Sequence, residues 1–215
     1  MSPPAPLRLA PGETLSLGPV VVQNNAWGRG DLRPGRDFLQ SAEITPEAVV
    51  FTWSWPPPET SPGVRAYPEV FAGRKPWGPE TGGEALPAPL AAAESLALRY
   101  AFTAEGDPAG FTPAFDLWLS PDPAGGPAAL SHEIMVWLAP GPRRPAGRPV
   151  ARLDAADGLP GPATLWAKPE HGRHGWTYLA AVLDAPAPAG RLELGPLLAA
   201  LRAEGLAPAE GWLLA

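Results

Sequence analysis

The stretch SHEIMVWLAP, from Ser131 to Pro140, has the length and apolar content of a buried β-strand, yet its third residue is a glutamate. Side chains alternate between the two faces of a strand, so Glu133, Met135 and Trp137 share one face. The opposite face carries His132, Ile134, Val136 and Leu138. A carboxylate in apolar surroundings must be paired, protonated or used in chemistry. We therefore expect the aliphatic face to be core and the Glu133 face to be functional.

A second stretch, FDLWLS, divides in the same way. One face carries Asp116, Trp118 and Ser120, and the other carries Phe115, Leu117 and Leu119. If the two strands are neighbours, Asp116 and Glu133 approach each other on a surface that bears indole rings. Aromatic rings cover the apolar faces of sugars and a carboxylate can attack an anomeric carbon, so the pattern favours carbohydrate chemistry. The alternative is that each acidic residue is a solvent-facing charge, and spacing alone leaves both interpretations open.

The composition indicates one folded domain that covers residues 1–215. The chain has 24 glycines and 32 prolines, but its 45% hydrophobic content and nine tryptophans can offset the entropy of ordering. Its formal net charge is −6 with no basic stripe, which argues against nucleic acid as a partner. The chain contains no run of about 18 apolar residues, so no membrane-spanning helix is predicted. The absence of cysteine excludes disulfides and thiolate metal sites.

Short β-like runs alternate with Pro, Gly and Asp turns along most of the chain, which predicts an all-β sandwich or jelly roll. These runs are LSLGPVVVQNNAW, EAVVFTWSW, LALRYAFTAE, FDLWLS, HEIMVWLAP, PVARLDA, ATLWAKPE and WTYLAAVLDA. One helix is expected in LELGPLLAALRAEGLAP, with Pro196 at its first position and Gly205 as its C-cap. Its leucines fall on one face, so it should pack on the outside of a sheet. The segment from Gly78 to Glu94 is expected to be a long exposed loop.

Several motifs, in order, resemble those of glycoside hydrolase family 12, a family of small endoglucanases and xyloglucanases. The resemblance extends from about Val21 to the end of the chain. The motifs are NNAWG (24–28), WSW (53–55), YPEVFAGRKPWG (67–78), FDLWLS (115–120), HEIMVWL (132–138), RPAGRPV (144–150) and LWAKPEHGRHGWTYLAAVL (165–183).

The resemblance implies a concanavalin-like jelly roll of two antiparallel sheets with one α-helix on the outer face. It also implies a retaining endo-hydrolase of β-1,4-glucans such as cellulose, mixed-linkage glucan or xyloglucan. Glu133 matches the nucleophile, and Asp116 matches the neighbouring acid that tunes it; two carboxylates so close can share a proton. The matched cleft residues are Asn25, Trp27, Trp118, Met135, Trp137 and Pro145. No metal or organic cofactor is expected.

A retaining glycosidase also needs a second carboxyl group as acid and base. In the family this glutamate follows the strand that begins here with GWLLA, so we expect the chain to lack its last strands beyond Ala215. Glu170 is the in-chain candidate. The alternative function is therefore a carbohydrate-binding jelly roll without turnover, or a disabled hydrolase.

Two further features concern metal binding and location. His171 and His174 form a His-x-x-His in a Gly/Arg loop without acidic ligands, which favours solvated side chains over a metal site. The family resemblance implies secretion and a monomer. The segment MSPPAPLRLAPGE lacks the apolar core of a secretory signal, and without export the protein would be cytoplasmic.

Overall fold

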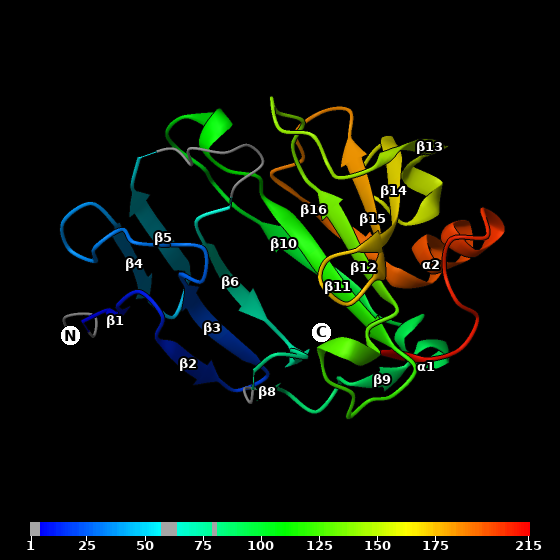
Figure 1. The fold of residues 1–215 in the computed structure, drawn as a ribbon, viewed down its shortest axis with the longest axis horizontal. Helices are drawn as coiled ribbons and strands as arrows, with labels where there is room; N and C mark the ends of the chain where they lie inside the picture. Colours follow the sequence, from blue (N-terminus) through cyan, green and yellow to red (C-terminus); the bar gives the residue numbers. More distant parts are fainter. Residues whose placement is uncertain (1–4, 57–63, 79–80) are drawn as a thin grey trace. The chain divides into compact units, whose positions relative to one another are not determined.

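In the computed structural model, which describes residues 5–56, 64–78 and 81–215, seven strands form one sheet in the order β13-β14-β15-β12-β11-β17-β9 (Figure 1). The strands of this sheet are β9 (Ala88–Pro89), β11 (Ala114–Ser120), β12 (His132–Trp137), β13 (Arg148–Leu153), β14 (Ala163–His171), β15 (Trp176–Leu183) and β17 (Trp212–Leu213). They belong to the larger of two compact units, formed by Arg74–Pro79 and Ala85–Ala215.

Most neighbouring strands of this sheet are antiparallel, but β12 and β15 run parallel, with Glu133 opposite Tyr178. The pairings of β13 with β14 and of β14 with β15 are antiparallel, so β13 also runs in the direction of β12. The chain leaves β12 at Trp137 and enters β13 at Arg148, which the register places level with Ile134. The loop 138–147 therefore returns along the direction of β12 by the length of about three strand residues, or ~10 Å.

The aliphatic face of the sheet forms the main core of this unit. Leu117, Ile134, Leu165 and Leu179 lie in one buried cluster. The two-stranded sheet of β10 (Ala97–Ala101) and β16 (Ala189–Glu193) packs against this cluster through Leu98, Tyr100 and Leu192. Each leucine buried here contributes roughly 1.5–3 kcal/mol relative to an exposed one.

The helix α2 (Leu194–Ala203) also packs on the aliphatic face, through Leu197, Leu198 and Leu201. It begins two residues before Pro196, because Glu193 at the end of β16 serves as its N-cap. Gly205 follows the C-cap with a φ of +70°, the left-handed conformation that glycine allows at a helix end. The expected helix and its place on the sheet are confirmed, but its predicted start is wrong, because Pro196 is the third residue of α2 and not the first.

The smaller unit, Met1–Gly73 with Glu80–Glu84, contains two three-stranded sheets. Their strands are β1 (Leu7–Leu9), β4 (Leu39–Ile44) and β5 (Val49–Ser54), and β2 (Thr14–Leu17), β3 (Val20–Asn25) and β6 (Tyr67–Phe71). Asn24 is buried, and its side chain donates to the Leu9 carbonyl and accepts from Gln40. The short strands β7 (Gly73–Arg74) and β8 (Thr81–Gly82) form a further two-stranded sheet.

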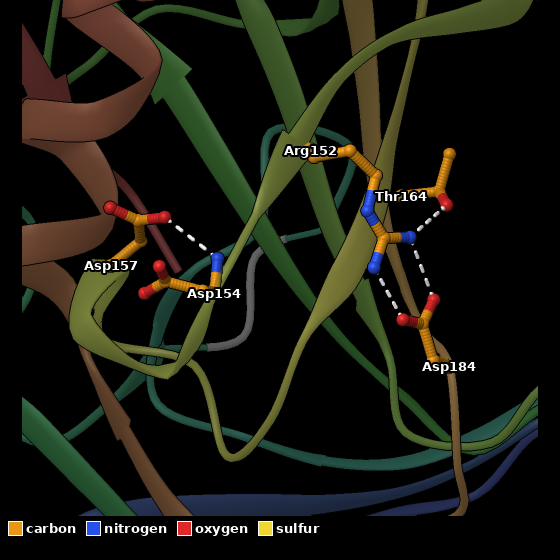
Figure 2. Close-up of polar contacts among 5 residues, drawn as sticks. All are labelled: Arg152, Asp154, Asp157, Thr164 and Asp184. Atoms are coloured by element: carbon orange, nitrogen blue, oxygen red, sulfur yellow. Dashed lines mark hydrogen bonds and ion pairs between the residues drawn. The ribbon is translucent and has the colours of Figure 1, made fainter.

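A polar cluster closes one end of β13, β14 and β15. Figure 2 shows Arg152 of β13 donating to Thr164 of β14 and to the carboxylate of Asp184. The bond to the Thr164 hydroxyl is 2.7 Å long. Beyond β13, Asp154 and Asp157 form a capping box around the short helix η3 (Ala155–Asp157). These contacts use exposed side chains, so they define the strand ends more than they stabilise the unit.

The all-β jelly-roll class is confirmed, with the parallel β12–β15 pair as a local departure from antiparallel pairing. The expected long exposed loop from Gly78 to Glu94 is wrong at β8 and again where β9 leads into the helix α1 (Leu90–Ala93), and residues 79–80 of this segment lie outside the described residues. Leu90 and Ala93 are buried in the main core, so this segment is held by packing. The remaining short helices are η1 (Pro108–Gly110) and η2 (Pro127–Ala129). Among the described residues, no helix has the length and hydrophobicity of a bilayer-spanning segment.

Candidate active site

Glu133 lies on β12 between Trp118 of β11 and Tyr178 of β15. Its side chain is 7% exposed, and Nε1 of Trp176 donates a hydrogen bond of 2.7 Å to its Oε2. Burial raises the pKa of Glu133 to about 7, and the bond from Trp176 partly opposes this rise. A proton on Glu133 is therefore gained and lost near neutral pH.

Asp116 lies on the same face as Glu133, on the neighbouring strand β11. The register pairs Asp116 with Met135 and Trp118 with Glu133, so the two acidic residues are diagonal neighbours. Diagonal side chains of an antiparallel pair are within reach of each other when they are long or polar. Among the described residues of the seven-stranded sheet, Asp116 is the only carboxylate at a register position beside Glu133.

Three indole rings meet next to the carboxylate of Glu133. Trp118 is buried and lies edge-to-face with Trp77 (centroids 4.6 Å apart) and with Trp176 (5.5 Å). Trp77 is 50% exposed and belongs to a segment whose Arg74 amide donates to the Leu214 carbonyl. The sequence predicted Trp118 as a substrate contact, but the solvent-facing ring of this group is Trp77.

Met135 and Trp137 continue the Glu133 face along β12. Both are buried in a cluster with Tyr178 and Ala180, separate from the aliphatic core. The sulfur of Met135 accepts contacts of 3.5 Å from Trp137 Nε1 and from the Tyr178 hydroxyl. The two faces expected from alternation are therefore both present, and these side chains form the floor beside Glu133.

The loop 138–147 crosses the sheet on the Glu133 face. Pro145 is buried, and Ala146 packs against the cluster of Met135 and Trp137. Gly147 has a φ of +87°, and a Cβ there would lie 2.1 Å from the carbonyl oxygen of Ala167. The loop is thus held against β14 at a position that only glycine fits. Beyond it, Trp137 lines a hollow of about 360 Å³ with Pro140, Arg143 and Pro186.

The β14–β15 turn supplies the hydrogen-bond donor to Glu133. His171 pairs with Trp176 across this turn, and its ring lies against those of Trp176 and Tyr178. Burial lowers the pKa of His171, which favours its neutral form. His174 is exposed, and the described residues contain no group of three His, Cys, Asp or Glu side chains placed to hold a metal ion.

Asn25 and Trp27 lie in the smaller unit, where they contact each other. The Asn25 side chain donates to Glu69 and accepts from the Trp27 amide, both at 3.1 Å. The Trp27 ring is 67% exposed and stacks on Tyr67 with centroids 6.2 Å apart and planes 11° apart. Asn25 and Trp27 line a hollow of about 340 Å³ together with Arg29. The stacked pair is a flat aromatic surface open to solvent.

Glu170, the in-chain candidate for a second carboxyl group, is exposed and lies in the irregular stretch between Lys168 and His171 of β14. Its φ of +52° places it in the left-handed region, which is uncommon for a residue other than glycine. No described contact joins its side chain to Glu133 or Trp176. Its assignment as acid and base stays a prediction.

No protein-family model and no curated protein sequence matches this chain. Solved structures do match it. Endo-1,4-β-glucanase CelB2, a cellulase, is 25% identical with a TM-score of 0.73, and the match covers 96% of this chain and 87% of that one. A ligand-bound family 12 xyloglucanase from Bacillus licheniformis is 19% identical with a TM-score of 0.77, covering 98% and 89%. A metagenome-derived family 12 endoglucanase is 24% identical with a TM-score of 0.70, covering 99% and 88%. The resemblance to glycoside hydrolase family 12 is confirmed by this match in fold over nearly the whole chain.

Proposed function

We propose that this chain is a retaining glycoside hydrolase of β-1,4-linked glucans, with Glu133 as its nucleophile. The observation that carries the proposal is a buried carboxylate, held by Trp176 and surrounded by indole rings, on one face of a jelly-roll sheet. The similar structures are named endoglucanases and a xyloglucanase, which supports a glucan as the substrate. We further propose one monomeric catalytic domain that is secreted to reach this polymer.

The proposed reaction has two displacements at the anomeric carbon. In the first, a carboxylate oxygen of Glu133 forms a bond to this carbon while the bond to the leaving-group oxygen breaks and that oxygen takes a proton from an acid. In the second, water that loses a proton to the conjugate base displaces Glu133 and restores the carboxylate. This chemistry requires Glu133 to be ionised and uses no metal or organic cofactor.

Asp116 is proposed to tune Glu133 rather than to act on the substrate. Its register position, diagonal to Glu133, supports this role, because two neighbouring carboxylates repel each other or share a proton. Met135, Trp137 and Pro145 are proposed to shape the surface beneath the sugar, and Trp118 is proposed to contact it. Asn25 and the exposed ring of Trp27 are proposed to bind sugar units of the substrate, as the family motifs imply for cleft residues.

The second candidate is carbohydrate binding without turnover. It is favoured by the stacked rings of Trp27 and Tyr67, because a flat exposed aromatic pair binds a sugar face whether or not catalysis follows. In that case glucan would bind the chain and no reducing ends would appear.

One experiment separates the two candidates. The chain and its Glu133→Gln variant are incubated with soluble β-glucan and with xyloglucan, and reducing ends are measured together with binding. Hydrolysis by the parent that is lost in the variant, with binding retained, supports the enzyme. Equal hydrolysis by the parent and the variant would refute the nucleophile assignment. Binding by both proteins without hydrolysis would favour the second candidate.

A dinitrophenyl cellobioside extends this test, because an activated aryl leaving group needs little help from a general acid. The first turnover should release dinitrophenolate and leave a glycosyl adduct on Glu133, which peptide mass spectrometry can locate. Glu170→Gln should leave this first turnover intact and, if Glu170 is the acid, should abolish cleavage of the polysaccharide. An adduct on a residue other than Glu133 would refute the mechanism.

A further inference from the structure

The β14–β15 turn brings Trp176 to Glu133 in a fixed orientation. Trp176 is the first residue of β15 and lies 43 positions after Glu133, yet its Nε1 is 2.7 Å from Glu133 Oε2. The N–H of an indole is a donor only, so this bond favours the ionised carboxylate. It is a charge-assisted contact in a largely buried place, where such bonds are strong.

The Trp176 ring is enclosed on three sides. The ring of His171 lies edge-on to it at 5.9 Å, and that of Trp118 lies edge-on at 5.5 Å. The third side is the backbone of Gly172, where a Cβ would lie 2.3 Å from Cη2 and 2.5 Å from Cζ2 of the Trp176 ring. A side chain at position 172 therefore cannot coexist with the ring in this place.

We propose that the β14–β15 turn positions the nucleophile: Gly172 and His171 hold the Trp176 ring so that its N–H fixes Glu133 Oε2 and presents the other oxygen, Oε1, to the anomeric carbon. This inference rests on the proposed role of Glu133. Trp176 is then a positioning residue, because it acts through Glu133 and makes no bond to the reacting atoms. A fixed carboxylate loses less freedom on reaching the transition state, which lowers the barrier to attack.

The charge of Glu133 is set by few neighbours. The titratable groups on the strands around it are Asp116 on β11, Tyr178 on β15, and Lys168, Glu170 and His171 on β14, and His132 precedes it on β12 with its side chain on the opposite face. The bond from Trp176 lowers the pKa of Glu133 against the larger effect of burial. Loss of this bond should therefore protonate Glu133 at a higher pH, and the activity should report that change.

The first test replaces Trp176 with phenylalanine, which keeps an aromatic ring and removes the N–H. The first-turnover rate with a dinitrophenyl cellobioside should fall about tenfold, and the acidic limb of its pH profile should move up by about one unit. Binding of a glucan oligosaccharide to the Glu133→Gln variant should not change when Trp176→Phe is added. A merely structural role would alter thermal stability and binding without moving the acidic limb.

The second test uses two glycines of the same turn. Gly172 and Gly175 both have positive φ, at +64° and +77°, so alanine is strained to a similar degree at either position. A Cβ on Gly172 meets the Trp176 ring, whereas a Cβ on Gly175 has no atom within 4 Å. Gly172→Ala should reproduce the shift of the acidic limb seen with Trp176→Phe, and Gly175→Ala should retain the parent profile.

The outcomes separate this inference from the proposed function. If Glu133→Gln is inactive while Trp176→Phe and Gly172→Ala keep the parent pH profile, the positioning role is refuted and the nucleophile stands. If Glu133→Gln is as active as the parent, the proposed function itself fails. If Trp176→Phe does not fold, the comparison of Gly172→Ala with Gly175→Ala still decides, because equal profiles for these two variants overturn the inference.

Discussion

Trp118 on β11 and Glu133 on β12 face each other across one rung of an antiparallel ladder, on the face of the sheet that points away from the aliphatic core. The Trp118 ring is itself wedged between the rings of Trp77 and Trp176. Glu133 is therefore a carboxylate next to indole rings, with little water around it. Two predictions concern what this burial does to its proton.

The first prediction is the pH dependence of the proposed chemistry. Burial raises the pKa of Glu133 to about 7, and only the ionised form can attack an anomeric carbon. The first-turnover rate with an aryl cellobioside should fall tenfold per unit below about pH 7. Asp116→Asn should move this limb to lower pH, because it removes a like charge beside Glu133. If the first-turnover rate of the parent stays constant down to about pH 4, the assignment is contradicted.

The second prediction is a stability effect of the same group. The pKa of Glu133 is raised on folding from 4.5 to about 7, so its contribution is fully present below pH 4.5 and is lost as the pH rises to about 7. Glu133→Gln cannot ionise and should gain up to roughly 3 kcal/mol over the parent by pH 8. Unfolding by urea at pH 4 and pH 8 measures the difference. A gap that does not grow between these pH values would argue against a buried, ionising Glu133.

The third prediction concerns the loop that crosses the Glu133 face. A Cβ on Gly147 would collide with the Ala167 carbonyl at 2.1 Å, so Gly147→Ala should destabilise the protein by roughly 3 kcal/mol and displace Pro145. Gly141 lies in the same loop and has no atom closer than 4.0 Å to such a Cβ, so Gly141→Ala should stay within about 0.5 kcal/mol of the parent. Equal melting temperatures for the two variants would contradict this packing.

The fourth prediction tests the packing of α2 on the sheet. Leu197 is fully buried in the core, so Leu197→Ala should cost roughly 3 kcal/mol. Leu39 on β4 is 48% exposed, and Leu39→Ala should cost less than about 1 kcal/mol. Denaturant unfolding of both variants gives the comparison. A small loss at Leu197 would mean that the helix is not part of the core.

The two faces of β11 and β12 could be predicted from sequence because alternation is a local property. Ile134 and Val136 lie in the aliphatic core, and Met135 and Trp137 lie in the separate cluster of the other face, as the period of two requires. The helix α2 could be predicted for the same reason, since its leucine spacing and Gly205 are close together in the chain.

The donor to Glu133 could not be predicted, because it depends on the register between distant strands. Trp176 reaches Glu133 only because β15 pairs parallel with β12, and no local pattern indicates that pairing. The exposed Trp77 and the buried Leu90 were missed for a related reason. Both lie near Pro- and Gly-rich sequence, and packing within the larger unit decides their environment.

The parallel pairing of β12 with β15 also determines when this part of the sheet can form during synthesis of the chain. A ribosome adds about 5 to 20 residues per second, so the 43 positions between Glu133 and Trp176 take roughly 2 to 9 seconds to synthesise. Until then β12 has no β15 beside it, and the backbone N–H and C=O groups on that edge are open to pairing with other chains. The same arrangement that encloses Glu133 thus leaves the nascent chain exposed to aggregation for a few seconds, and slower synthesis would prolong that exposure.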